Sequence, residues 1–502
     1  MALTRRFFAA LAGSAALIGA KSRAQDAKIL RVALGGFPLE RSNPYANIQT
    51  PSIIFHTAVF EGLTHLNLDG SVSPRLATAW EQRDPLTWRF KLRDDVVFSN
   101  GKAFDAGAVA HAVNYLTGPG PANEDARRDL NFLAGATVVD KHTVDIRTQT
   151  PRFTLPRYCS VLLIVEPEAW ATLGPVKFAE QPVATGPMVV DEWQPARALF
   201  RRNPTAWRSP QIDGVEYINL PDVPARIAAL QSGRIDVAYG VAPEDIDAVT
   251  AVGGTIATVR DGAAMCIVLN FQGGRATPLA DVRVRRALNL AVDRQAIVDV
   301  LMGGLTVASG QPSVRQAFGF DPALGPYPHD PAAAKALLAE AGYANGFTMT
   351  LETSGGSTNG VAVVQRVAED LKRVGVNMVV RQKQTIKFLN DFVNGVYEAD
   401  SFTLQWGGYP TLDALQFTNL SSCRKAKPWF CDPAIQPVIE QAWAETDPAQ
   451  ALALRHQVMR HYRDQAPGIF LHENIAFVGL SPRTTGYQPI FGHVDYDLVR
   501  IG

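Results

Sequence analysis

The sequence lacks most of the features that would indicate an enzyme, a nucleic-acid-binding protein or a membrane-spanning protein. It has 48 lysines and arginines against 48 aspartates and glutamates, so the basic excess that binding to a phosphate backbone requires is missing. After residue 24 no apolar run approaches the roughly 18 to 20 residues that cross a bilayer. The motifs G-x-S-x-G, H-E-x-x-H and G-x-x-x-x-G-K-[ST] are also absent. The sequence therefore nominates no catalytic residue, and neither a cofactor nor a nucleic-acid partner is expected.

The first 24 residues differ in composition from the rest of the chain. Arg5 and Arg6 precede an uncharged apolar run from Phe7 to Ala20, and Ser22-Arg23-Ala24 has the small-x-small spacing of a cleavage site. Because residues 4–8 resemble the twin-arginine export motif, we expect a signal peptide at residues 1–24 and a mature protein in the periplasm. Cleavage leaves 44 basic and 48 acidic residues, a net charge of −4.

The chain has only four cysteines, and in an oxidising compartment such as the periplasm cysteines can form stable disulfides. Cys423 and Cys431 are spaced as a short disulfide loop. Their C-x7-C spacing is not that of a zinc site, and no metal site is predicted. Cys159 and Cys266 lie in apolar stretches, where we expect small buried side chains.

Strand-like and helix-like stretches alternate along the chain, which is typical of an α/β protein. In the first half the predicted strands are residues 29–34, 215–220 and 235–239, with a helix at 224–232. In the second half the predicted helices are residues 284–291, 294–302, 331–341 and 361–374, and the predicted strands 347–351 and 377–380. Each half therefore has its own βαβ units.

Residues 88–113 predict a strand, a tight turn and a capped helix. The strand has period-two alternation between Trp88 and Leu92 and resumes at 96–98. Asn100-Gly101 suits a tight hairpin, and Asp105 can accept hydrogen bonds from the first turn of a helix. We interpret the segment as structural scaffold without catalytic or binding residues, and its value is that its pattern helps to recognise the type of protein.

Taken together, eight segments resemble the extracellular solute-binding proteins of the peptide/nickel group (family 5), the soluble receptors of ABC importers. Each segment alone is a weak signal, but they follow the family's order over nearly the whole mature chain. They are residues 60–63, 68–77, 88–113, 184–187, 232–237, 281–298, 330–343 and 405–409.

The resemblance implies an α/β fold of two lobes, the type II periplasmic-binding-protein fold with an extra subdomain, closing by a hinge. By analogy lobe I comprises residues 25–262 and 474–502, with the subdomain at about 51–180, and lobe II comprises residues 263–473. The lobes would be joined by two crossing strands near Gly262 and His472. Gly262 is suited to a hinge because glycine tolerates dihedral angles that other residues avoid, although a plain turn glycine is the alternative.

The resemblance also implies ligand contacts. Trp406 lies in a glycine-rich loop that matches the family's cleft segment, where aromatic faces stack on the ligand and glycines let the backbone approach it. Arg157 resembles the arginine with which nickel-binding relatives hold a chelator's carboxylate. A core position for Trp406 and a solvent-exposed Arg157 are the alternatives. The full set of candidates is Trp406, Gly407, Gly408, Tyr409, Arg157, Phe37, Tyr45, Thr353 and Ser354.

The implied function is capture of a peptide-like solute by a monomeric receptor that delivers it to an ABC permease. Peptide-binding relatives carry an aspartate just after the tryptophan, whereas here the first acid is Asp413. This departure favours modified peptides, opine-like compounds or metal chelates over ordinary peptides. His456 and His461 are five positions apart and do not share a helical face, so direct metal ligation is not expected. An exported hydrolase and a peptide chaperone are the alternatives outside transport.

Overall fold

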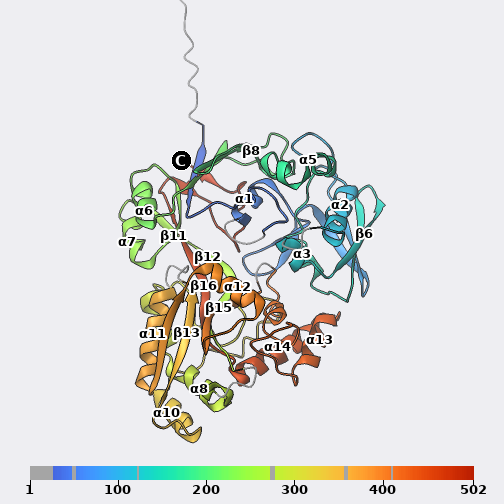
Figure 1. Cartoon of the computed structure of the whole chain (residues 1–502). Helices are drawn as coiled ribbons and strands as arrows, with labels where there is room; N and C mark the ends of the chain where they lie inside the picture. Colours follow the sequence, from blue (N-terminus) through green and yellow to red (C-terminus); the bar gives the residue numbers. More distant parts are fainter. Residues whose placement is uncertain (1–26, 48–51, 121–123, 272–276, 355–359, 409–410) are drawn as a thin grey trace, which may run out of the picture.

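The computed structural model describes residues 27–47, 52–120, 124–271, 277–354, 360–408 and 411–502. Within these residues a ten-stranded sheet runs through both parts of the molecule, in the order β14-β13-β15-β12-β16-β11-β1-β10-β9-β8. Its two long central strands, β12 (Thr255–Leu269) and β16 (Gly468–Leu480), extend from the upper part to the lower part of Figure 1. We call the upper part, which carries β1 and β8–β11, lobe I, and the lower part, which carries β13–β15, lobe II.

Lobe I is built on a mixed sheet. Strand β1 (Ile29–Leu34) lies parallel to β10 (Gly214–Asn219) and to β11 (Val237–Val241), and α6 (Val223–Gln231) connects the last two. The predicted βαβ unit is confirmed. Strands β9 (Arg197–Arg202) and β8 (Met188–Trp193) extend the sheet antiparallel to β10, and α7 (Ile246–Thr250) follows β11.

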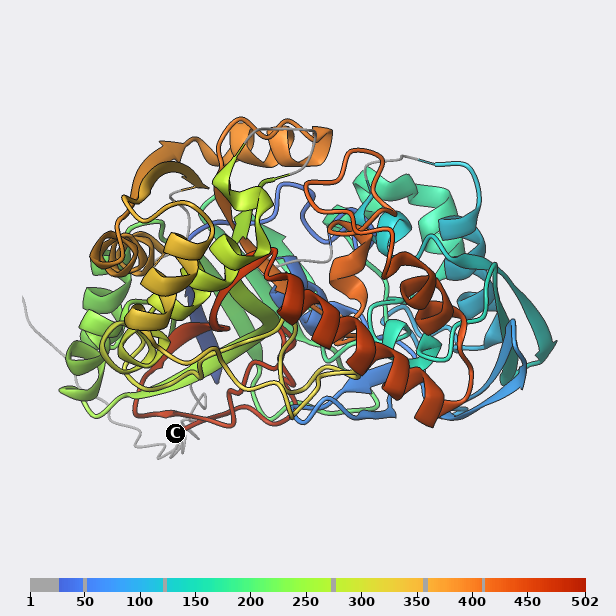
Figure 2. The same cartoon turned by 90° about the horizontal axis from the view of Figure 1, so that it is seen from below.

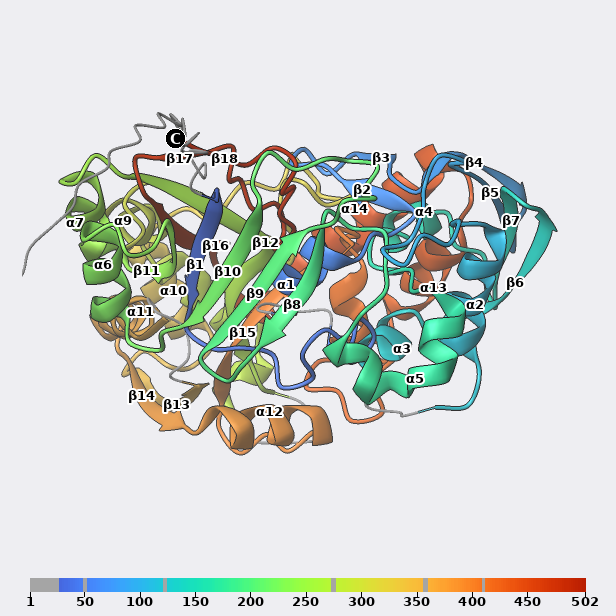
Figure 3. The ribbon, with the colours of Figure 1, turned by 90° about the horizontal axis from the view of Figure 1, so that it is seen from above.

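A subdomain of lobe I lies to one side of this sheet (Figure 3). Its own antiparallel sheet has the order β4-β5-β7-β6, formed by Ala77–Asp84, Thr87–Leu92, Thr143–Thr148 and Leu133–Asp140. Helices α2 (Ala106–Thr117), α3 (Asp125–Asp129), α4 (Leu155–Tyr158) and α5 (Pro167–Glu180) accompany it, with the hairpin of β2 (Thr64–Leu66) and β3 (Val72–Pro74). Asp105 caps α2 as predicted, accepting from the backbone N–H groups of Gly107 and Ala108.

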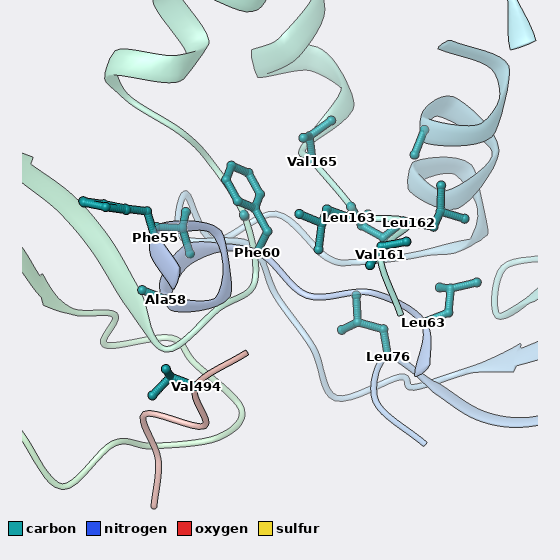
Figure 4. Packing of buried hydrophobic residues seen from close by; sticks show 14 of the residues in the cluster. Phe55, Ala58, Phe60, Leu63, Leu76, Val161, Leu162, Leu163, Val165 and Val494 are labelled. Carbon is teal, nitrogen blue, oxygen red and sulfur yellow. The ribbon is translucent and has the colours of Figure 1, made fainter. Parts of the chain in front are cut away.

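The core of lobe I continues from the main sheet into the subdomain. Figure 4 shows Phe55 and Ala58 of α1 (Ser52–Val59) next to the chain that carries Phe60 and Leu63, with Val161–Val165 packed beside it. One apolar cluster therefore extends from the main sheet of lobe I into the subdomain.

Lobe II has helices on both faces of its sheet. Strand β13 (Phe347–Ser354) lies parallel to β14 (Val376–Lys383) and β15 (Ser401–Gly407), and β15 pairs antiparallel with β12. One face packs against α8 (Val282–Ala291), α10 (Pro331–Glu340) and α11 (Gly360–Arg373), all three as predicted. The other packs against α13 (Gln436–Ala444) and α14 (Pro448–Gln465), which lie on the side below the subdomain (Figures 1 and 2); α12 (Thr385–Asn394) follows β14.

Two predictions of local structure need correction. The helix expected at 294–302 is one α-helical turn, α9 (Arg294–Ala296), followed by a wider π turn at Ile297–Leu301. Residues 96–98 form only an isolated bridge, Val97 to Ala103, because the chain turns at once into the tight hairpin. The predicted export signal lies outside the described residues.

The predicted disulfide between Cys423 and Cys431 is confirmed, and Cys159 and Cys266 are buried free thiols. The disulfide closes a loop that carries Trp429 and Phe430, both fully buried in the aromatic core of lobe II.

Because cross-linking restricts the unfolded chain, replacing both cysteines with serine is expected to lower the free energy of unfolding by about 2 to 3 kcal/mol. Denaturant unfolding checks this, with reductant on the wild type as control. Equal unfolding free energies of variant and wild type would contradict it.

Candidate functional site

The carboxyl ends of the parallel strands β13 and β15 meet at one edge of the lobe II sheet, and several of the candidate ligand-binding residues lie there. The hydroxyl of Thr353, at the end of β13, lies 3.1 Å from that of Thr403 on β15. Ser354 next to it is half-buried. A role for either residue in ligand binding stays a prediction.

Trp406 near the end of β15 is a core residue. It is 2% exposed, the ring of Phe417 stacks on the indole at a centroid distance of 5.5 Å, and the Trp429 ring lies tilted by 30° at 5.1 Å. Packing against these rings fits the core alternative, and a role of Trp406 in ligand binding stays a prediction. Its Nε1–H has no acceptor among the described residues.

Gly407 and Gly408 permit a close approach, but to the protein's own backbone. A Cβ on Gly407 would lie 2.3 Å from the carbonyl oxygen of Gly262, and one on Gly408 would lie 2.8 Å from Leu412 Cα. These glycines let β15 pack closely against the crossover at Gly262 and against the loop after β15, and their approach to a ligand stays a prediction. Tyr409 lies outside the described residues.

Asp413, the first acid after Trp406, already has a partner. Its two carboxylate oxygens accept from Nε and Nη2 of Arg455, each at 3.1 Å, and both side chains are buried. Burial alone would raise the pKa of Asp413, but the Arg455 guanidinium lowers it below its ordinary value. The carboxylate thus has a cationic partner within lobe II, and the expectation that it does not reach a ligand amine stays a prediction.

The loop that carries Asp413 is strained. Leu412 has a φ of 54° and a fully buried side chain, and leucine rarely adopts this left-handed conformation. Such strain persists only where surrounding contacts fix the chain. The backbone around Phe318 supplies them, because Phe318 N–H donates to the Leu412 carbonyl and the Phe318 carbonyl accepts from Ala414 N–H.

Arg157 lies in α4 of the subdomain, where lobe I faces lobe II. Its guanidinium carbon is 5.7 Å from the ring centroid of Phe318 in lobe II, and burial lowers its pKa although the Asp413 charge opposes the shift. Its Nη1 is buried and has no acceptor among the described residues. A buried guanidinium N–H without an acceptor is costly unless a further group pairs with it.

The two aromatic candidates of lobe I differ in position. Tyr45 is 1% exposed, packs against Tyr115 and Trp170, and donates its hydroxyl to the Leu163 carbonyl. Its expected place at the cleft is corrected, because the loop after β1 folds into the subdomain core. Phe37 is half-buried against neighbouring rings of lobe I, and its role stays a prediction.

The two crossing strands lose their regular pairing near the predicted hinge. The register of β12 against β16 shifts between Arg260 and Ala264, and Gly262 between them has a φ of 73°. His472 is buried, with Nδ1 2.9 Å from the Glu473 carbonyl, and burial lowers its pKa. Hinge roles for Gly262 and His472 stay predictions.

Asp261 connects the two strands at this irregularity. It accepts hydrogen bonds from Ala263 N–H and from the Asn474 amide, and burial raises its pKa to about 6. The folded protein thus holds this proton more tightly than the unfolded chain does, so this group's contribution to stability falls as pH rises from about 4 to about 6.

Asp261→Asn should remove that pH dependence. At pH 7 the variant is expected to be more stable than the wild type by up to about 3 kcal/mol, at roughly 1.36 kcal/mol per pKa unit, and at pH 4 equally stable. Unfolding free energies measured between pH 4 and 7 check this. A constant difference across that range would contradict the assignment.

The described residues contain no group of three or more histidine, cysteine or acidic side chains arranged to hold a metal ion. A small cavity inside lobe I, lined among others by Glu61, His65, Arg75 and Asp495, has a volume of about 30 Å³. That volume holds a single water, so this cavity is not a solute site.

Sequence reasoning missed several residues where the lobes meet. Thr154 and Tyr158 hydrogen-bond to Asp413 and Gln416, across 259 and 258 positions of the chain. The only local signal was the density of polar and aromatic residues around Arg157, and that pattern does not say what they contact.

Two α/β lobes that share paired crossing strands define the class of periplasmic binding proteins. The family model described as "Bacterial extracellular solute-binding proteins, family 5 Middle" matches residues 71–428, more than half of the chain. The chain therefore belongs to the bacterial extracellular solute-binding proteins of family 5, as predicted. None of its described helices is long and apolar enough to cross a membrane.

Named relatives agree with this assignment. The chain is 26% identical to the glutathione-binding protein GsiB of Pectobacterium atrosepticum over 518 residues, covering 99% of each chain. It is 27% identical to the nickel-binding periplasmic protein of Escherichia coli over 497 residues, covering 92% of each. The periplasmic binding protein DppA of Helicobacter pylori, solved with the peptide STSA, has the same fold with a TM-score of 0.77 at 20% identity, covering 94% of this chain and 98% of that one.

Proposed function

We propose that the protein is the periplasmic receptor of an ABC importer that captures a carboxylate-bearing, peptide-like solute between its lobes and releases it unchanged to a membrane permease. The observation that carries the proposal is Arg157, whose buried Nη1 lacks an acceptor among the described residues at the junction of the lobes. A guanidinium binds a carboxylate through two parallel hydrogen bonds. A ligand carboxylate would therefore supply the missing partner.

The pairing of Asp413 supports a ligand recognised by its carboxylate rather than by its amine. Arg455 already neutralises Asp413, and transferring that charge to a ligand amine would leave a buried guanidinium without a partner. Glutathione, which the relative from Pectobacterium atrosepticum binds according to its name, carries two carboxylates. Chelators that carry metals offer the same group, so a metal chelate is the second candidate, favoured by the nickel-binding relative.

The proposed mechanism is a shift between open and closed forms. A solute that touches both lobes stabilises the closed form, which the permease then recognises. Micromolar affinity corresponds to about −8 kcal/mol, which a few buried contacts of a preorganised cleft provide. No covalent step is needed.

Isothermal titration of the mature protein tests the ligand class. Glutathione, its diethyl ester and nickel–histidine are compared, with nickel ion alone as control. We expect a carboxylate-bearing compound to bind with micromolar affinity and the ester to bind at least tenfold more weakly. Equal affinity for glutathione and its diethyl ester would overturn the assignment of Arg157 as the partner of a ligand carboxylate. Mass spectrometry of the bound compound decides against a hydrolase if the compound is recovered intact.

A further inference from the structure

Residues 152–158 of the subdomain bind lobe II through two hydrogen bonds. The Thr154 hydroxyl donates to Asp413 Oδ2 at 3.0 Å, and the Tyr158 hydroxyl donates to Gln416 Oε1 at 2.8 Å. Thr154 and Tyr158 are buried, and burial raises the pKa of Tyr158, so the Tyr158 hydroxyl stays protonated.

Stacking contacts flank these hydrogen bonds. The Arg152 guanidinium lies between the Phe132 ring of the subdomain and the Trp443 ring of α13, 4.3 Å from each centroid. Phe153 contacts Phe318 of lobe II at 5.7 Å between ring centroids. Leu66 of the β2–β3 hairpin packs in the apolar cluster of lobe II as well.

The surface that receives this segment is prearranged within lobe II. Arg455 fixes both oxygens of Asp413, and Leu415 N–H donates to Oδ1 at 3.1 Å. The Phe318 segment is tied by backbone hydrogen bonds to residues 412 and 414. Because these contacts lie within one lobe, the acceptor surface does not depend on lobe I for its shape.

The two sides of this contact belong to different lobes, so separation of the lobes must break it. We propose that residues 152–158 form an interlobe latch, in which Thr154 and Tyr158 are positioning residues that hold the closed form and place Arg157 at the junction. The latch is a proposal separate from the proposed function, because its contacts join the two lobes whether or not a solute binds. Only the claim that the latch places Arg157 for a ligand rests on the proposed function. It predicts that the closed form is favoured in part by the protein's own contacts before any solute binds.

The double variant Thr154→Val/Tyr158→Phe tests the latch. Small-angle scattering of the ligand-free variant should give a larger radius of gyration than the wild type, and glutathione should dissociate about tenfold faster, the effect of losing a hydrogen bond to a charged group. Tyr239→Phe is the matched control, because its buried hydroxyl lies 2.8 Å from that of Tyr487 within lobe I. It should change neither quantity.

Two further variants keep the test decisive. Thr154→Ser retains the donor and should restore the wild-type values. Gln416→Met removes the half-buried acceptor from the lobe II side and replaces the double variant if that one fails to fold. A shift in either readout, with Tyr239→Phe unchanged, supports the latch; unchanged scattering together with unchanged dissociation overturns it. The scattering arm needs no ligand, so a failure of glutathione to bind counts against the proposed function alone.

Discussion

Arg455→Met is expected to lower the free energy of unfolding by about 3 to 5 kcal/mol, the largest effect on stability that the structure predicts. The variant leaves the Asp413 carboxylate buried with hydrogen bonds from Thr154 and Leu415 but without its guanidinium. Burial would then raise the pKa of Asp413, because the Arg455 charge that now lowers it is gone. Denaturant unfolding at pH 7 measures the loss.

Two comparisons separate this effect from ordinary loss of a surface ion pair. Arg201→Met removes the partner of Asp191, in a pair whose arginine side chain is 63% exposed, and should cost at most about 1 kcal/mol. Adding Asp413→Asn to Arg455→Met removes the orphaned charge, so the double variant should be less destabilised than the sum of the single variants. If the loss of unfolding free energy in the double variant equalled the sum of the losses in the single variants, the interaction between Asp413 and Arg455 would be contradicted.

Arg157→Gln is expected to weaken binding of a carboxylate-bearing solute such as glutathione by about 10- to 100-fold, because a hydrogen bond to a charged group contributes roughly 1.5 to 3 kcal/mol. The same change should leave the ligand-free protein equally stable or more stable, since it removes a buried guanidinium group whose Nη1 has no partner among the described residues. Titration calorimetry and thermal unfolding measure the two effects.

A loss of affinity without a loss of stability distinguishes a ligand-binding residue from a structural one. A residue needed only for folding would lower both stability and affinity when replaced. Arg157→Lys keeps the charge but not the planar fork, so its affinity should fall between those of wild type and Arg157→Gln. Unchanged affinity in Arg157→Gln would remove Arg157 from the site.

Local signals in the sequence predicted the elements well. Asp105 and Asp330 begin helices because their side chains accept orphan backbone N–H groups, and this chemistry is complete within four residues. The βαβ units followed from apolar periodicity in the same way. The π turn at Ile297–Leu301 was missed because its periodicity matches that of an ordinary helix over so short a stretch.

The candidate site was less predictable because it depends on contacts between distant segments. Trp406 was expected at the cleft, but Trp429, held in a disulfide loop, folds back beside it. Tyr45 was misplaced because the loop after β1 packs into a subdomain that no local pattern places there. The pairing of Asp413 with Arg455 spans 42 positions and could not be inferred from spacing.

Small-angle scattering of the mature protein with and without glutathione, on samples in which binding is confirmed by titration, tests the central claim most directly. We expect the radius of gyration to fall when the solute binds, as the two lobes close about the strands that cross near Gly262, and glutathione to be recovered chemically unchanged. Identical scattering of the free and the saturated protein, or conversion of glutathione, would contradict it.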